Sequence, residues 1–424
     1  MKEYDIIIIG GGATGTATAH VLSEYTNVEK IVLIEKYGKI AQVQSKSSSN
    51  SQTLHYGDIE TNYSLEKAKQ VKPKAELVQN YVEKHPGLHR KFHKMVLAVG
   101  EKEVARLESR FKEFKKLFPE LKLIYNEEIA KVEPKIVEGR DKNIKLAALF
   151  SPNGYTVDFG RLSCSFMENS DVNLIVNTKV NSIVKKKDGY VINNEYKAKV
   201  VMVCASGHSL YFAHQLGYGR ELILLPVAGS FFCSKKKLNG KVYTLQLPKL
   251  PFAAVHGDPD VVNPNETRFG PTAKVIPMLE RYRYNSVLDF IKLFRLRWSA
   301  LVSMVKIISD PTYFRFMWTN MLYDIPWAGK YFFIKNVRKI IPSMMLDELH
   351  YGNGIGGIRP QIVNTNTKSI SFGEAKLIGE NIIFNITPSP GASMCLANAE
   401  DDAKSVCKFL GKKFDQKKFD KELR

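Results

Sequence analysis

The first 35 residues combine two hydrophobic runs with a helix-like segment between them. Tyr4 to Ile9 is a short run rich in β-branched residues, which is typical of a strand buried on both faces. Thr16 to Tyr25 predicts a helix that begins with small residues. Val28 to Glu35 predicts a second strand, centred on Ile31 to Ile34. The order strand, helix, strand indicates a β-α-β unit at the start of an α/β fold.

A glycine-rich turn joins the first strand to the helix. Its sequence, Gly10-Gly11-Gly12-Ala13-Thr14-Gly15, satisfies the pattern G-x-G-x-x-G. In such a turn Gly10 permits the tight bend, Gly12 lets the backbone approach a pyrophosphate, and Gly15 lets the helix pack on the strand. The helix N-terminus would meet the phosphates, and Glu35 at the end of the second strand would bind the ribose hydroxyls. The unit therefore predicts a dinucleotide site.

The same pattern occurs a second time, at residues 352–357, but without the surrounding elements. No hydrophobic strand precedes it, and Arg359-Pro360 after it opens no helix, so we expect a loop there. A flavoprotein that uses NAD(P)H needs two well-formed copies of the motif. If the cofactor is FAD, its electrons must therefore come from a substrate and leave to an acceptor other than a nicotinamide.

Two further segments have helical spacing of apolar residues. Ser64 to Lys131 is rich in Lys and Glu and predicts helices. Leu279 to Ser343 contains all three tryptophans with eleven Lys or Arg and only four acidic residues. Such helices can lie in a membrane interface, or they can pack their apolar face on the protein's own core.

Three histidines stand four residues apart in the first of these helical segments, at His85, His89 and His93. On one helix face they could hold a metal ion, but no carboxylate or cysteine is arranged with them. We interpret them as surface histidines and predict no metal site.

Composition and charge narrow the class of protein. The chain has 424 residues and 48.0 kDa, with 44% hydrophobic and 25% charged residues, which excludes a disordered or collagen-like chain. Its net charge of +19 would attract nucleic acid, an anionic membrane surface or small acidic substrates. No nucleic-acid-binding module is recognisable, so we expect no nucleic-acid partner.

The cysteines and the N-terminal segment bear on location. The five cysteines are odd in number and form no C-x-x-C pair, which favours a reducing compartment without disulfides or a zinc site. The start of the chain lacks the basic region of a signal peptide. The uncharged stretch from Ile6 to Ser23 predicts the strand and turn above rather than a membrane span. We expect a cytoplasmic protein, with or without peripheral contact with the inner face of the cell membrane.

Several motifs resemble those of one enzyme family. The polar segment Ser47 to Tyr63 resembles the segment after the first β-α-β unit of the malate:quinone oxidoreductases, with Leu54 where that family has glycine. Three later segments are also similar: Val255 to Asp258 resembles P-H-L-D, Gly357 to Ile362 resembles G-x-R-x-Q-I, and Ser389 to Ser393 matches S-P-G-A-S in full. The wider group comprises FAD-dependent hydroxy-acid and amine oxidoreductases, which include the L-2-hydroxyglutarate oxidases.

The resemblance implies FAD as cofactor and an α/β fold. This fold has a Rossmann-type FAD-binding domain (1–63, 151–225 and 350–424), a helical insertion (64–150) and a mixed-sheet substrate domain (226–349) that contains the basic, aromatic-rich helical segment 279–343. Besides the motif residues Gly10, Gly12, Ala13, Thr14, Gly15 and Glu35, the resemblance places further residues around the FAD. These are Ser49, Asn50, Ser51, Val180, Ala205, Ser206, Gly207, Pro390, Gly391, Ala392 and Ser393.

Motif position also suggests catalytic roles for oxidation of a 2-hydroxy acid. Arg359 would grip a substrate carboxylate, with Gln361 as its hydrogen-bonding neighbour. His256 would accept the hydroxyl proton, and His55 would lie near the flavin. Alternatively, Arg359 compensates charge on the reduced flavin, and either histidine is structural.

Three hypotheses about function remain open. The first is FAD-dependent oxidation of L-malate to oxaloacetate, with electrons passed to a lipid quinone at the membrane surface. The second is the same fold acting on L-2-hydroxyglutarate or an amino acid, with quinone or oxygen as acceptor. The third is a polyanion-binding protein with a degenerate nucleotide fold.

Overall fold

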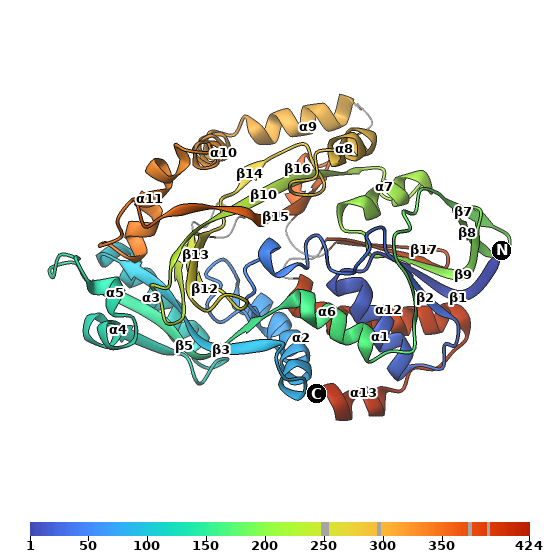
Figure 1. Cartoon of the computed structure of the whole chain (residues 1–424), viewed down its shortest axis with the longest axis horizontal. Helices are drawn as coiled ribbons and strands as arrows, with labels where there is room; N and C mark the ends of the chain where they lie inside the picture. Colours follow the sequence, from blue (N-terminus) through green and yellow to red (C-terminus); the bar gives the residue numbers. More distant parts are fainter. Residues whose placement is uncertain (247–253, 295–297, 372–374, 388–390) are drawn as a thin grey trace.

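Two β-sheets form the framework of the protein (Figure 1). The computed structural model describes residues 1–246, 254–294, 298–371, 375–387 and 391–424. The chain passes between the two sheets several times, so each sheet is assembled from segments that are far apart in the sequence. The fold is α/β, as the sequence predicts.

The first sheet contains the predicted β-α-β unit. Strand β1 pairs in parallel with β2, and helix α1 (Ala13–Tyr25) connects them. The sheet runs in the order β17 (Ala375–Gly379), β18 (Ile382–Thr387), β9 (Tyr196–Val203), β1 (Lys2–Ile9), β2 (Ile31–Ile34) and β6 (Asn173–Ile175). The hairpin of β7 (Ile183–Lys186) and β8 (Gly189–Ile192) joins the sheet through β8, which pairs antiparallel with β9.

The central strand is buried on both faces. Ile6 and Ile8 pack into one apolar cluster with residues of α1 and α12 (Cys395–Leu410). Ile7 and Ile9, on the other face, pack into a second cluster with residues of α7 (Gly207–Gln215). This arrangement explains why the run Ile6–Ile9 is apolar at every position, because alternate residues of a strand face opposite sides of a sheet.

The second sheet is mostly antiparallel. Only β11 and β3 pair in parallel among its described strand pairs. Its order is β16 (Ser369–Ser371), β15 (His350–Asn364), β10 (Leu222–Lys235), β13 (Glu266–Gly270), β12 (His256–Pro259), β11 (Lys241–Thr244), β3 (His89–Val99), β5 (Leu146–Val157) and β4 (Lys122–Tyr125), and β14 (Lys274–Val275) also pairs with β10.

Residues 64–131 are not helical throughout, and that prediction is corrected. Helices α2 (Leu65–Lys84), α3 (Glu101–Phe114) and α4 (Asn126–Val132) form, but β3 lies between α2 and α3. His85 follows the end of α2, whereas His89 and His93 lie on β3, so the three histidines share no helix face. Pairing with β5 and β11, both distant in sequence, overrides the local helical pattern.

The second glycine-rich match is also not a loop. Residues 352–357 lie inside strand β15, which pairs with β10. Strand β15 comes from the segment assigned above to the FAD-binding domain, yet its hydrogen bonds place it in the second sheet. The predicted domain boundaries as a whole stay a prediction.

Four helices cover one side of the second sheet, along the upper edge of Figure 1. They are α8 (Ser286–Phe294), α9 (Trp298–Ile308), α10 (Pro311–Tyr323) and α11 (Gly329–Ile340). Two short helices, α5 (Pro134–Val137) and α6 (Phe159–Glu168), complete the connections. Within the described part of the chain, no helix combines the length and apolar character that crossing a membrane requires.

The C-terminal segment adds one more helix, α13 (Gln416–Leu423). Its Phe419 and Leu423 are buried, and the Phe419 ring lies 5.1 Å from that of Tyr25 in α1. The lysine-rich C-terminal segment therefore packs on α1 through one apolar face.

We expect Phe419→Ala to lower the free energy of unfolding by about 3 kcal/mol, because it leaves a cavity between α13 and α1. Urea unfolding of the holoprotein would measure this loss. The exposed Lys417 on the same helix provides the control, and Lys417→Ala should change stability by less than about 0.5 kcal/mol. Equal stability of the two variants would show that the tail does not dock.

Candidate active site

A large cavity lies where segments of both sheets meet. Most residues predicted to bind the cofactor or to act in catalysis line it. They are Gly10, Gly12, Ala13, Thr14, Glu35, Ser49, Asn50, Ser51, His55, Val180, Ala205, Ser206, His256, Arg359, Gly391, Ala392 and Ser393. The fold thus brings together segments that are almost 400 residues apart in the chain.

Three predicted residues do not line the cavity, and one cannot be placed. Gly15 lies beneath the glycine-rich turn, and Gly207 begins α7, where a Cβ would lie 3.0 Å from the Leu224 side chain. Gln361 is buried in β15 two residues beyond Arg359, so a direct role in the cavity is not supported. Pro390 lies outside the described residues.

The glycine-rich turn has the close backbone contacts that its sequence predicts. Gly10 has a φ of +108°, and a Cβ there would lie 2.6 Å from the Cys204 carbonyl oxygen. A Cβ on Gly15 would lie only 2.0 Å from the Gly10 carbonyl oxygen. At Gly12 the nearest atom to such a Cβ is the Ser45 hydroxyl at 3.2 Å. Two glycines therefore let the turn pack tightly, and the third leaves its backbone open to the cavity.

Helix α1 points its N-terminus at the cavity. Its N-cap residue is Gly12, which has no side chain to cap the helix, and the Ser45 hydroxyl accepts a hydrogen bond from the Ala13 N–H at 2.8 Å. A helix N-terminus carries free backbone N–H groups and a partial positive charge, which suit the pyrophosphate of a dinucleotide.

Glu35 is held in place beside this turn by the backbone. Its Oε2 accepts a hydrogen bond from the Gly11 N–H at 2.7 Å, and its Oε1 accepts one from the Tyr37 N–H at 2.9 Å. The carboxylate is buried at the cavity wall and keeps acceptor capacity for ribose hydroxyls. Turn, helix and carboxylate together fit the adenosine diphosphate half of FAD.

His55 links two cavity-lining segments. Its backbone N–H donates to the Ser393 hydroxyl at 3.0 Å, and its Nδ1 lies 2.5 Å from Oε1 of Glu60. Burial raises the pKa of Glu60, but the hydrogen bond and charge of His55 outweigh this and hold that pKa at about 2. His55 is thus fixed at the cavity wall by its contacts with Glu60 and Ser393.

His256 lies on β12 and is buried, with its Nδ1 2.8 Å from Oδ2 of Asp258. Burial lowers the pKa of His256, and this effect exceeds the opposing attraction of Asp258. Burial alone would raise the pKa of Asp258, but the neighbouring His256 and Lys241 bring it down to about 2. At neutral pH the imidazole is therefore uncharged and able to accept a proton.

Arg359 extends from β15 into the cavity. The residue is exposed because it borders the cavity, and the protein atoms packed around its guanidinium lower its pKa through desolvation. The groups that act electrostatically on it are the neutral phenols of Tyr63 and Tyr243. No hydrogen bond or ion pair joins its guanidinium to any of the residues that the structure describes. Such a cation fits an anionic group of a ligand.

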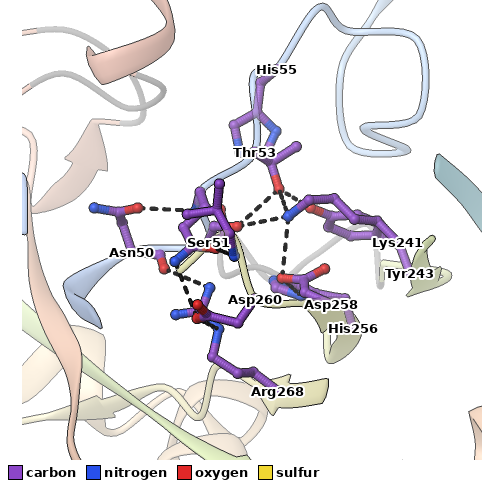
Figure 2. A network of polar contacts seen from close by, with 12 residues as sticks. Asn50, Ser51, Thr53, His55, Lys241, Tyr243, His256, Asp258, Asp260 and Arg268 are labelled. Atoms are coloured by element: carbon purple, nitrogen blue, oxygen red, sulfur yellow. Dashed lines mark hydrogen bonds and ion pairs between the residues drawn. The ribbon is translucent and has the colours of Figure 1, made fainter. Parts of the chain in front are cut away.

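A buried polar network forms the wall around His256, and Figure 2 shows how its side chains converge. Sequence reasoning missed four of its members. Lys241 and Tyr243 of β11, Thr53 and Arg268 make hydrogen bonds or ion pairs with one another or with Asp258 and Asp260. The one sequence signal was the alternation His256, Asp258, Asp260, which places all three side chains on one face of a strand.

Outside the cavity, Cys233, Glu266 and His350 bring three potential metal ligands within 4.8 Å of one another. None of them lines the cavity, and we assign them no role in its chemistry. All five cysteines are free.

Comparison with known proteins agrees with this geometry. Residues 5–400 match the family model described as FAD dependent oxidoreductase. The L-α-glycerophosphate oxidase of Mycoplasma pneumoniae, solved with FAD bound, has a similar fold, with a TM-score of 0.69 and 21% identity over 98% of this chain and 96% of that one. The glycine oxidase of Geobacillus kaustophilus also has a similar fold, with a TM-score of 0.64 and 14% identity over 96% of this chain and 95% of that one. The chain is an FAD-dependent oxidoreductase.

More similar sequences identify the family within this class. A probable malate:quinone oxidoreductase of Campylobacter jejuni is 42% identical over 100% of this chain and 99% of its own length. The malate:quinone oxidoreductase of Helicobacter pylori is 38% identical over 99% of this chain and 98% of its own length. A mitochondrial L-2-hydroxyglutarate dehydrogenase of Caenorhabditis elegans is 26% identical over 94% and 92%. The chain belongs to the malate:quinone oxidoreductase family, which leaves the polyanion-binding hypothesis without support.

We expect Gly15→Ala to lower the flavin bound per protein by about tenfold or more, because its Cβ would collide with the Gly10 backbone. Absorbance of the purified variant would measure bound flavin. The control is Gly354→Asn in the second glycine-rich match. Gly354 has a φ of +73° with open space around it, and asparagine tolerates this conformation. Unchanged flavin in the Gly15 variant would contradict the site.

Proposed function

We propose that this protein oxidises L-malate to oxaloacetate and passes the electrons to a membrane quinone. The observation that carries the proposal is the guanidinium of Arg359, which lines the same cavity as the buried, neutral His256 and has no protein partner in the described structure. Family membership supports the same substrate and acceptor.

The reaction removes a hydride from C2 of malate and a proton from its hydroxyl group. Bound FAD supplies the hydride acceptor. Arg359 binds a substrate carboxylate through two parallel hydrogen bonds, which fixes the position of C2. His256 takes the hydroxyl proton on the imidazole nitrogen opposite Asp258, and the carboxylate of Asp258 stabilises the imidazolium that results. His55 holds its cavity-lining loop in place through Glu60 and Ser393.

We expect L-malate to bleach the flavin of the anaerobic holoprotein, whereas Arg359→Met should slow this reduction by about a hundredfold or more while retaining FAD. Stopped-flow absorbance would measure both rates. Arg359→Lys keeps the charge but loses the paired geometry, so its rate should lie between the two. Bleaching by L-2-hydroxyglutarate alone would replace the substrate. An Arg359→Met enzyme that malate reduces at the parent rate would show that Arg359 does not hold the substrate carboxylate.

The acceptor side of the proposal rests on a separate surface. Of the 20 large apolar side chains that are exposed in the described structure, 13 lie between residues 282 and 332. They include Trp298, Trp318 and Trp327, exposed by 77%, 57% and 83%, on or beside helices α9 to α11. The segment is also rich in Lys and Arg.

We propose that this helical surface docks on an anionic membrane. Apolar residues would enter the interface while basic residues meet the lipid headgroups. The inner side of the same helices packs on the sheet behind the cavity. Val227 and Ala273 line the cavity and also belong to the apolar cluster that includes Ala300 and Met304 of α9. The docking surface and the flavin cavity thus lie on opposite sides of one thin apolar layer.

We expect the triple variant Trp298→Ser, Trp318→Ser, Trp327→Ser to bind phosphatidylglycerol vesicles about tenfold or more weakly than the parent protein. Co-sedimentation would measure binding. A double variant of exposed apolar residues on the first sheet, Leu174→Ser with Val184→Ser, is the control and should bind normally. An equal loss in both variants, or no vesicle binding by the parent, would contradict a docking role for these helices.

A further inference from the structure

A row of buried charged side chains crosses the second sheet beneath the cavity. In the strand register, Lys94 of β3 neighbours Lys241 of β11, which stands opposite Asp258 of β12, which in turn neighbours Arg268 of β13. All four are almost completely buried, with exposed fractions of 0% to 1%. Since directly opposite residues point to the same face, the four side chains lie side by side.

Each cation of this row has a carboxylate partner. Lys94 Nζ lies 2.7 Å from Asp58, Lys241 Nζ lies 3.5 Å from Asp258, and Arg268 Nε lies 3.1 Å from Asp260. Three basic and three acidic groups therefore balance, as burial of charge requires.

His256 lies directly opposite Tyr243. It stands two residues before Asp258 on the same face of β12, and unlike Asp258 it lines the cavity. Protonation of its imidazole would add a positive charge that this balanced set does not compensate. Among the groups that face it, Asp258 attracts the proton, whereas Lys241 and Arg268 repel it. The Tyr243 ring lies 4.5 Å away, tilted by 37°, and the phenol stays neutral, because burial raises its pKa well above the usual value. Phe231, on the other side, carries no charge.

Lys241 has a second set of contacts, on the loop that lines the cavity. Its Nζ donates hydrogen bonds to the Ser51 carbonyl at 2.8 Å and to the Thr53 hydroxyl at 2.9 Å (Figure 2). The Thr53 hydroxyl also lies 2.6 Å from that of Tyr243. One ammonium group thus touches both the cofactor-side loop and the carboxylate that holds His256.

We propose that Lys241 is a positioning residue of this site. Its buried charge adds to the effect of burial, opposes the pull of Asp258 and so helps to keep His256 neutral and able to accept the proton of the substrate. Its hydrogen bonds fix Ser51 and Thr53 beside the same imidazole. Burial lowers the pKa of Lys241 itself to about 8, so it carries this charge at neutral pH and loses it in moderately alkaline solution. This inference rests on the proposed role of His256 as the base.

The decisive variant is Lys241→Gln, which removes the charge but keeps a hydrogen-bond donor for the loop. Loss of this neighbouring positive charge should raise the pKa of His256 by about one unit. NMR titration of the holoprotein with 13C-labelled histidine would measure that pKa without turnover, with the signal assigned by its absence in His256→Gln. The acidic limb of flavin reduction by L-malate should move upward by the same amount.

Lys94→Gln is the matched control. Lys94 has the same side chain and burial but lies one strand further from His256, with its own partner Asp58, so its loss should move the titration less. An equal shift in both variants, or no shift in Lys241→Gln, would overturn the assignment.

A second comparison covers the case in which Lys241→Gln does not fold. Asp258→Asn alone should lower the pKa of His256, and the double variant with Lys241→Gln, in which both charges are gone, should titrate higher than Asp258→Asn. Equal titration of these two variants would also overturn the assignment.

The two levels of the proposal fail separately. A shifted His256 titration in a protein that malate does not reduce would retain the role of Lys241 and overturn the proposed function. Reduction of the flavin by malate with an unshifted His256 titration would retain the proposed function and overturn the role of Lys241.

Discussion

A charge buried in a protein needs a partner of opposite sign, and this constraint shapes the wall of the active site. Strands β3, β11, β12 and β13 carry Lys94, Lys241, Asp258 and Arg268 on one face. The sheet itself supplies too few acids for these cations. Asp58 comes from the loop that follows the nucleotide-binding unit, and the backbone carbonyl of Ser51 accepts from Lys241. The charged row therefore attaches the loop of residues 51–58 to the second sheet.

This attachment positions the two halves of the cavity relative to each other. The same loop carries His55, whose backbone N–H donates to the Ser393 hydroxyl near the start of α12. Helix α12 packs on the first sheet. A segment of a few residues thus contacts the catalytic wall on one side and the cofactor-binding domain on the other. The dinucleotide half depends on a different constraint, the van der Waals contact between Gly10 and Gly15, which leaves no room for a side chain.

Arg359 stands apart from this pattern of satisfied charges. The buried cations of the wall are ion-paired, whereas the described structure provides no partner for Arg359. Its side chain reaches the cavity rather than the interior, and binding of an anionic substrate is a physical reason for a cation at that place. Whether a cation has an ion-pair partner within the protein therefore separates structural charges from ligand-binding ones more clearly than the sequence motifs do.

The β-α-β unit and its glycine turn were predictable because their signals are local. A run of β-branched residues, three glycines at fixed spacing and an acid after the second strand specify the geometry within 35 residues. Local sequence patterns gave the wrong secondary structure where pairing with a distant strand determines it. Residues 89–99 and 352–357 became strands because β5, β11 and β10 pair with them, and nothing near them in the sequence carries that information.

The sequence by itself determined the family, the nucleotide-binding motif and the candidate residues His55, His256 and Arg359, since each lies in a recognisable segment. Only the tertiary structure decided which of these side chains is free and which is paired. It also revealed Lys241 and Tyr243, which belong to no motif. The reason is physical: burial and strand register bring together charges from distant segments, and the protonation of His256 depends on all of them at once.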